Sequence, residues 1–118
     1  MLPDAFVTYV PDCSGEQSVG WASNHIQKLR AGEEVSFRPR GNSMIPLIHS
    51  GQLCTIEPVA AADVAVGDIV LCKVNGAEYL HLVKARQGER LQIGNNQGRI
   101  NGWVSPNSIF GRLIRTED

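Results

Sequence analysis

The order of hydrophobic and polar residues predicts short β-strands over most of the chain. From Val35 onward, apolar residues alternate with polar ones or form short continuous runs, and glycine, proline and asparagine separate these segments. The clearest boundary is Asn75-Gly76, because both positions tolerate a positive φ and favour a two-residue hairpin turn. Segment 94–102, rich in glycine and asparagine, is predicted to be a loop. The predicted strands are residues 35–38, 53–57, 69–74, 78–84, 90–93 and 109–115.

The region before these strands has a helical pattern instead. A capping-box pair, Ser14 and Gln17, precedes apolar residues at helical spacing, and Gly32 follows them as a stop signal. We therefore predict one amphipathic helix at about residues 16–31. Residues 1–15 are predicted to form either a strand across the domain or a flexible arm. The apolar face of the helix consists of Val19, Ala22, Ile26 and Leu29.

Six or so short strands behind one helix predict a mostly β protein. We expect a coiled β-sheet or partial barrel with one N-terminal amphipathic helix. The chain has 118 residues, which is enough for a single domain with a hydrophobic core. Within that domain, we expect residues 1–34 to form an arm and a helix that pack on a β domain at residues 35–118.

The composition argues against some binding partners and indicates a cellular compartment. A net charge of −1 argues against broad electrostatic binding, so no direct nucleic-acid binding is expected. No apolar run approaches the roughly 20 residues that a membrane span needs. Cys13, Cys54 and Cys72 contain no Cys-x-x-Cys pair and show no metal-ligand spacing with the histidines. We therefore expect reduced thiols, a cytoplasmic protein, and neither a metal nor another cofactor.

The segment Gly41-Asn42-Ser43-Met44-Ile45-Pro46 is the first candidate for chemistry. Its glycine permits a tight bend that points the backbone N–H groups of Asn42 and Ser43 toward one place, as an oxyanion hole requires. A serine nucleophile also needs a base, and His81 lies in the middle of a predicted strand. Alternation puts a second candidate base, Lys84, on the opposite face of that strand. On their own, such a turn and such a histidine are more often structural features.

Three short motifs then occur in a fixed order. They are Ser43-Met44-x-Pro46, Ser50-Gly51, and Gly67-Asp68-Ile69-Val70 followed by a base on the next strand. Together they resemble the superfamily of LexA-type and signal-peptidase-type serine peptidases, over roughly residues 35–115. The resemblance implies that Ser43 is the nucleophile. It also implies that His81 is the general base, as in the archaeal and eukaryotic signal-peptidase branch, whereas the LexA-type and bacterial branches use lysine.

The chain differs from the histidine branch around the base. That branch usually follows its histidine with arginine, where this chain has Leu82, and it carries acidic residues of which one orients the base. Here the matching segment is Gly94-Asn95-Asn96, and Asn101 stands about where the second acid would be. We therefore expect Asn95 or Asn101 to orient His81, without the stabilisation that a carboxylate gives to an imidazolium.

These features favour a small soluble serine endopeptidase that uses a Ser43/His81 dyad to cleave an extended peptide. The alternative is a LexA-like module with weak or no catalysis that binds a protein partner or forms a homodimer. An edge strand such as residues 109–115 would serve for that pairing. A third alternative is a regulator of phage or mobile-element type that reaches nucleic acid through a partner. Self-cleavage at Ala31-Gly32 is not expected, because this pair is too close in sequence to reach back to Ser43.

Overall fold

The computed structural model describes residues 21–118 and shows a mostly β protein with one α-helix, which confirms the predicted fold class. The helix, α1 (Ser23–Arg30), precedes seven strands within this range. Short 3-10 helices at Ala61–Asp63 and Pro106–Ser108 precede the third and the last strand. The strands are β1 (Val35–Phe37), β2 (Leu53–Pro58), β3 (Ile69–Val74), β4 (Ala77–Gln87), β5 (Arg90–Gly94), β6 (Ile100–Val104) and β7 (Ile109–Glu117).

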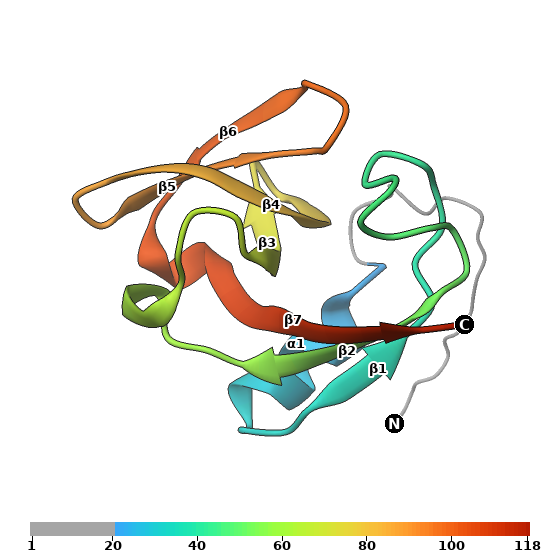
Figure 1. Ribbon diagram of the computed structural model, residues 1–118. Helices are drawn as coiled ribbons and strands as arrows, with labels where there is room; N and C mark the ends of the chain where they lie inside the picture. The colour runs from blue at the N-terminus through green and yellow to red at the C-terminus, as the bar shows by residue number, and fades with distance from the viewer. Residues whose placement is uncertain (1–20) are drawn as a thin grey trace.

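The seven strands form one antiparallel sheet in the order β1-β2-β7-β3-β4-β5-β6. β7 pairs with β3 near its start and with β2 farther along, so it joins the two halves of the sheet. The expectation that residues 109–115 form an edge strand is therefore wrong, because β7 has a neighbouring strand on each side. The sheet bends around β7 and stays open, with β1 and β6 as its terminal strands in the described part of the chain (Figure 1). This bend brings segments that are far apart in the sequence to the same end of the molecule.

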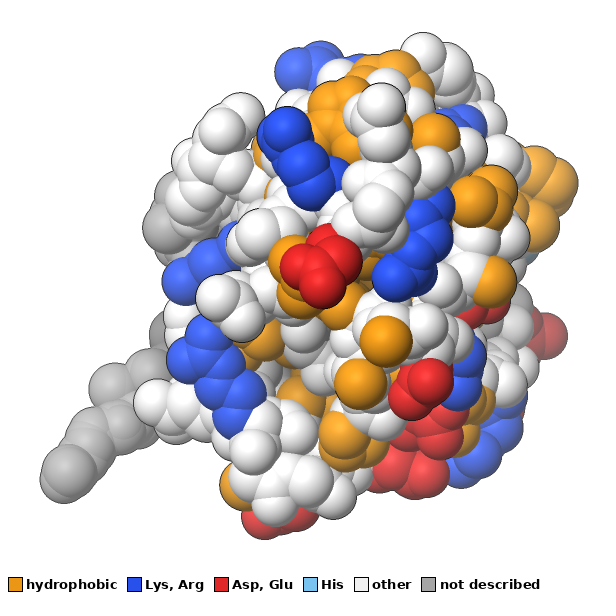
Figure 2. All heavy atoms as spheres, turned by 90° about the vertical axis from the view of Figure 1, so that its left-hand side faces the viewer, with side chains coloured by type: hydrophobic (Ala, Val, Ile, Leu, Met, Phe, Trp, Pro, Cys, Tyr) orange, Lys and Arg blue, Asp and Glu red, His pale blue; other side chains and the backbone are white. Residues whose placement is uncertain are grey.

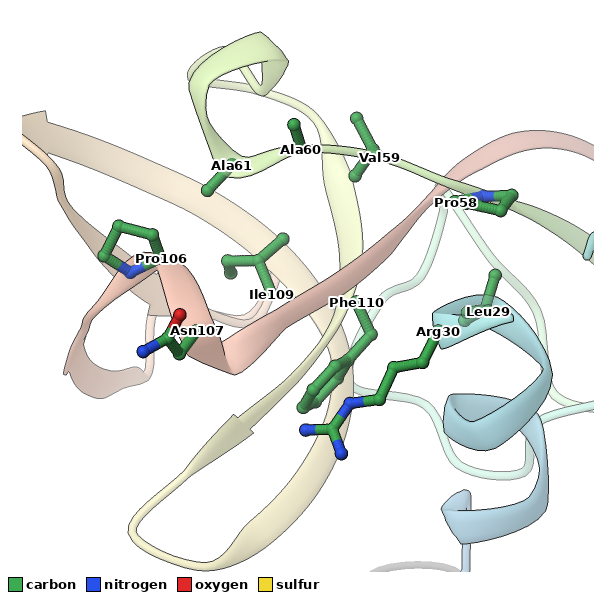
Figure 3. Close-up of a pocket in the computed structure, with 10 residues that line it drawn as sticks. All are labelled: Leu29, Arg30, Pro58, Val59, Ala60, Ala61, Pro106, Asn107, Ile109 and Phe110. Carbon is green, nitrogen blue, oxygen red and sulfur yellow. The ribbon is translucent and has the colours of Figure 1, made fainter. Parts of the chain in front are cut away.

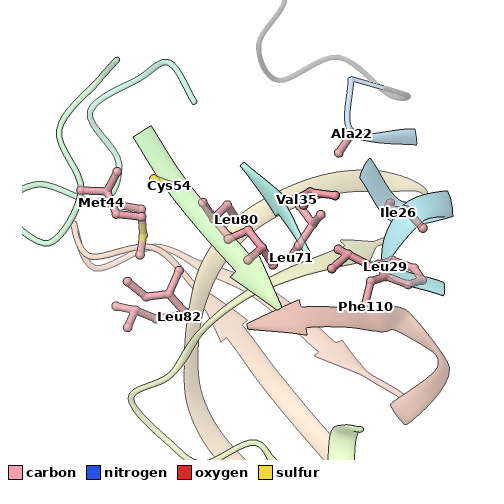
Figure 4. Packing of buried hydrophobic residues seen from close by; sticks show 13 residues of the cluster. Ala22, Ile26, Leu29, Val35, Met44, Cys54, Leu71, Leu80, Leu82 and Phe110 are labelled. Carbon is pink, nitrogen blue, oxygen red and sulfur yellow. The ribbon is translucent and has the colours of Figure 1, made fainter. Parts of the chain in front are cut away.

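Both faces of the central strands are buried, which explains the continuous apolar run of β3. Ile69 and Leu71 face a first hydrophobic cluster beneath α1, whereas Val70 faces a second cluster against β5 and β6. In the first cluster, Leu29 of α1 lies beside Phe110 of β7 (Figure 4). Successive side chains of β3 and β4 point alternately into the first and the second cluster. These two strands are therefore packed on both faces and form the centre of the fold.

The helix begins differently from the sequence prediction. The residues just before α1 form a turn, and the predicted capping box at 14–17 lies outside the described residues. The cap comes instead from β4, where the Glu78 carboxylate accepts hydrogen bonds from the Ala22 N–H (2.6 Å) and the Ser23 hydroxyl (3.1 Å). Gly32, with a φ of 90°, ends the helix as predicted. No helix within residues 21–118 is long and apolar enough to cross a membrane.

Each predicted strand is present, and the structure adds one more. β3 has the predicted bounds, and Asn75 and Gly76 have φ values of 52° and 85° in the predicted hairpin turn. The loop prediction for residues 94–102 is wrong at its C-terminal part, because β6 begins at Ile100 and pairs with β5. Hydrogen bonds to β5 stabilise a strand here despite the unfavourable strand propensities of asparagine and glycine.

Candidate active site

Ser43 lies in the loop between β1 and β2, which is closed at its base by hydrogen bonds. The Gly51 N–H donates to the Pro39 carbonyl (2.8 Å), and the Gly41 N–H donates to the Ser50 hydroxyl oxygen (3.1 Å). Gly41 has a φ of 116°, a left-handed conformation that favours glycine and produces the predicted bend. The serine itself is half-buried at the top of this loop.

The residues that follow the serine anchor the loop in the core. Met44 and Ile48 are 5% and 4% exposed, and the Ile48 N–H donates to the Met44 carbonyl (3.0 Å) in a helical turn. In Figure 4, the Met44 side chain points toward Leu82, and both belong to the first hydrophobic cluster. Leu82 directly follows His81 on β4. The neighbours of Ser43 and His81 therefore pack together, and this packing fixes where the two polar side chains meet.

His81 lies near the middle of β4, paired with β3, and is only 5% exposed. Leu80 and Leu82 point into the first hydrophobic cluster, as the alternation along the strand predicted. The imidazole stacks on the Tyr79 ring, with the centroids 4.8 Å apart and an interplanar angle of 27°. The stacking and the burial hold the ring in a single orientation.

The structure brings Ser43, His81 and Asn101 together in a chain of two hydrogen bonds. Ser43 Oγ lies 3.2 Å from His81 Nε2, and His81 Nδ1 lies 2.7 Å from Asn101 Oδ1. An amide oxygen only accepts, so the proton must sit on Nδ1, and Nε2 is left with a lone pair. Nε2 can therefore accept the hydroxyl proton of Ser43. The arrangement is that of a nucleophile, a base and a group that orients the base.

The protonation state of His81 suits a general base. Burial lowers the pKa of the imidazole below its ordinary value of 6.5. The hydrogen bond with Asn101 raises this pKa, and the positive charge of Arg99 lowers it. Because the net direction is downward, the ring is neutral at pH 7 and can take up a proton from the serine.

The two asparagines proposed as orienting groups have different partners. Asn101, on the terminal strand β6, contacts the imidazole. The Asn95 side-chain oxygen instead accepts hydrogen bonds from the backbone N–H groups of Gln97 (2.8 Å) and Arg99 (2.9 Å). Asn95 therefore shapes the turn between β5 and β6, and Asn101 orients the ring.

The β5–β6 turn is tied directly to the serine loop, a link that sequence reasoning missed. The Asn96 N–H donates to the Ser43 carbonyl (2.8 Å). The Asn96 side chain donates to the Ile45 carbonyl (2.9 Å), which also accepts a hydrogen bond from the Gln97 side chain (3.0 Å). In Figure 1, these two loops meet at one end of the sheet. The sequence signal was the run of amides after β5, but their partner lies far away in the chain.

The proposed oxyanion hole is compatible with the backbone of the serine loop. Within residues 21–118, neither the Asn42 N–H nor the Ser43 N–H donates a hydrogen bond to another protein group. Gly41, whose positive φ turns the chain at this point, directly precedes Asn42. Within the described residues, both N–H groups thus lack a protein acceptor, as an oxyanion hole requires.

Lys84, the second candidate base, occupies a different position from His81. Its aliphatic part covers Gly94, since a Cβ added to that glycine would lie 3.1 Å from both Cγ and Cε of the lysine. Among the hydrogen bonds of the described residues, none joins Lys84 to Ser43, whereas His81 is in direct contact with it. The geometry favours His81 as the base.

The two cysteines in the described part of the chain, Cys54 and Cys72, show no sign of nucleophilic or metal chemistry. Burial raises the pKa of Cys54 to about 11 and that of Cys72 to about 12, so both thiols stay protonated at neutral pH. Both are free thiols, and Cys13 lies outside the described residues. Residues 21–118 contain no group of three His, Cys, Asp or Glu side chains placed to hold a metal ion.

An open pocket of about 440 Å³ lies elsewhere, between α1 and the start of β7 (Figure 3). The Arg30 guanidinium lies over the Phe110 ring there, 4.9 Å from its centroid. Neither Ser43 nor His81 lines this pocket, and among the described residues that do, Arg30 is the one with a charged side chain. It therefore holds no nucleophile and base of its own, and the chemistry points to the Ser43 loop.

Comparison with known protein families and with curated protein sequences finds no match to this chain. The observation with the most chemical content is the hydrogen-bonded series Ser43, His81 and Asn101.

Proposed function

We propose that this protein is a serine endopeptidase in which Ser43 and His81 form the catalytic dyad. The observation that carries the proposal is the 3.2 Å contact between Ser43 Oγ and the Nε2 atom of a buried imidazole. Such a contact is the arrangement that activates a serine hydroxyl for acyl transfer. The resemblance of the sequence motifs to LexA-type and signal-peptidase-type serine peptidases supports the same assignment.

In the first step, Ser43 Oγ attacks the carbonyl carbon of the scissile bond as its proton passes to His81 Nε2. The oxygen of the tetrahedral intermediate accepts hydrogen bonds from the Asn42 and Ser43 N–H groups. The C–N bond then breaks, His81 gives the proton to the leaving amine, and an acyl-enzyme ester remains on Ser43. Water, deprotonated by His81, hydrolyses the ester and restores the serine. Asn101 keeps Nδ1 protonated throughout, so that Nε2 faces the reacting atoms.

The substrate is proposed to be an extended peptide. β6 carries Asn101 and is a terminal strand of the sheet within the described residues, so it has one edge without a neighbouring strand. A peptide backbone can pair with such an edge as an additional strand. This mode of binding would bring a main-chain carbonyl close to the Ser43 loop without a deep pocket.

Covalent labelling with a serine-directed fluorophosphonate tests the proposal without a known substrate. We expect the probe to modify Ser43, as read by mass spectrometry of the digested protein. Ser43→Ala should abolish labelling, and His81→Gln should slow it by about two to four orders of magnitude, the usual contribution of a general base. Ser105→Ala is the matched control, because Ser105 is exposed and its side chain has no hydrogen bond within residues 21–118. Labelling that persists in Ser43→Ala would rule out the dyad.

A second function is favoured by the identity of the orienting group. Asn101 positions the imidazole, but its neutral amide does not compensate the positive charge that His81 acquires during catalysis. The alternative is therefore a LexA-like module with weak or no catalysis that binds a protein partner or dimerises. Folded protein that resists the fluorophosphonate, together with a stable stoichiometric complex in a pulldown, would support this alternative.

A further inference from the structure

We propose that the Ser43 site selects peptides that carry an acidic side chain next to the scissile bond. This inference rests on the proposed peptidase function and names its substrate class. It starts from the charges of the two loops that build the site. The serine loop, residues 38–52, contains Arg38 and Arg40, and the β5–β6 segment, residues 94–102, contains Arg99. Neither segment contains an aspartate or a glutamate, although the chain as a whole has a net charge of −1.

The arginines lie close to the reacting atoms. Arg40 is three residues from Ser43, so their Cα atoms are at most about 11 Å apart. Arg99 is two residues from Asn101, which contacts His81, and its charge reaches the imidazole strongly enough to lower the pKa of His81. Both arginines are therefore close in sequence to residues that form the candidate site, and Arg99 is near enough to influence the charge of His81.

Arg40 and Arg99 are also available for binding. Both are exposed, and neither side chain has a hydrogen bond or an ion pair with residues 21–118. Arg38 has a structural role as well, because it donates to the Gly51 carbonyl (2.8 Å) at the base of the loop. In the described part of the chain, one carboxylate contacts the serine loop. It belongs to Asp118 and accepts a hydrogen bond from the Gln52 side chain (3.2 Å) at the base of the loop.

Other parts of the surface have a different charge pattern. On the face that forms the left-hand side of Figure 1, acidic and basic side chains lie next to one another (Figure 2). Arg112, for example, pairs with Glu57 at 2.9 Å and with Asp68 at 3.6 Å. By contrast, Arg40 and Arg99 have no acidic partner within residues 21–118, and they belong to the segments that carry Ser43 and Asn101. Guanidinium groups of this kind bind carboxylates by charge-assisted hydrogen bonds.

The test uses three peptidyl phosphonates that differ at a single residue beside the reactive phosphorus, namely glutamate, glutamine or lysine. The second-order rate constant for labelling of Ser43 is measured by mass spectrometry on the full chain. We expect the rate constant to be highest for the glutamate probe, lower for the glutamine probe and lowest for the lysine probe. Each arginine that contacts the glutamate carboxylate should increase the rate constant by up to about fivefold. The preference should shrink at high salt because both arginines are exposed.

Two single variants and a control identify the residues responsible. Arg40→Gln and Arg99→Gln should each reduce the ratio of the glutamate to the glutamine rate. The ratio is the readout because loss of Arg99 also removes its effect on the pKa of His81, which changes the rates for all probes together. Arg90→Gln, at the other end of β5, should leave this ratio unaltered. Equal labelling by all three probes would overturn the specificity and leave the peptidase function standing. If no probe labels Ser43 in folded protein, the peptidase function itself is refuted.

Discussion

At the scale of single residues, Asn101 is the most informative position in the site. It holds His81 in the tautomer that a general base needs, with a distance of 2.7 Å from its Oδ1 to His81 Nδ1. As an amide, it would supply no negative charge to the imidazolium that the proposed mechanism forms. The site therefore has the geometry of a nucleophile, a base and an orienting group. It lacks the carboxylate whose negative charge stabilises the imidazolium in a Ser-His-Asp triad.

Asn101→Asp should increase the reactivity of Ser43. A carboxylate can accept the same hydrogen bond and adds a negative charge, so the pKa of His81 should rise. The rate of fluorophosphonate labelling, measured from pH 4 to 9, should reach a higher plateau, and its acid limb should move to higher pH. Asn95→Asp is the control, since Asn95 binds backbone N–H groups of the turn and not the imidazole. An unchanged profile for Asn101→Asp would show that Asn101 does not govern the base.

At the scale of elements, local patterns predicted most strands but not the two features that depend on distant partners. The apolar run of β3 and the Asn75-Gly76 turn were sufficient to place that hairpin. β6 was missed because its asparagine and glycine favour a loop, and only pairing with β5 makes it a strand. The start of α1 depends on Glu78 of β4, which no local sequence signal indicates.

The candidate site, like the strands, was predictable from the sequence only where local patterns indicate it. Ser43 and His81 could be paired from the order of motifs and from the alternation along β4. The choice between Asn95 and Asn101 could not be made, because it depends on how the chain returns after β5. The bond from Asn96 to the Ser43 carbonyl was hidden for the same reason.

The anchoring of the serine loop by Met44 leads to an element-scale prediction. Met44→Ala should destabilise the fold by about 2–5 kcal/mol, because it leaves a cavity in the first hydrophobic cluster. It should also slow labelling of Ser43 by at least tenfold in protein that is still folded, since the loop loses its contact with the residue after His81. The measurements are chemical unfolding and fluorophosphonate labelling below the unfolding transition.

Ile26→Ala provides the matched control for Met44→Ala. Ile26 is 5% exposed in the same cluster but lies on α1, away from the serine loop in sequence. It should show a similar loss of stability with little change in the labelling rate of the folded protein. Equal slowing in both variants would mean that general destabilisation, and not the position of the loop, controls Ser43.

At the scale of the whole molecule, the buried His81 and the half-buried His25 should make stability depend on pH. Burial lowers the pKa of His81 below 6.5, and Arg99 adds to this effect. Burial also lowers the pKa of His25 on α1, with a further contribution from Lys28. In the unfolded chain both histidines regain an ordinary pKa. At a pH between the folded and the unfolded pKa, the unfolded state therefore binds more protons than the folded state does. Stability is therefore highest above pH 6.5 and decreases as the pH falls below it.

Chemical unfolding between pH 8 and pH 5 measures this effect. Each histidine can contribute a slope of at most about 1.4 kcal/mol per pH unit to the free energy of unfolding. His81→Gln and His25→Gln should each flatten the curve below pH 6.5, and the double variant should flatten it most. Above pH 7 the slopes of all four proteins should agree, because neutral histidines bind no protons in either state. If His81→Gln keeps the full slope below pH 6.5, then His81 is not held neutral in the folded protein, and its role as a base poised for Ser43 fails with it.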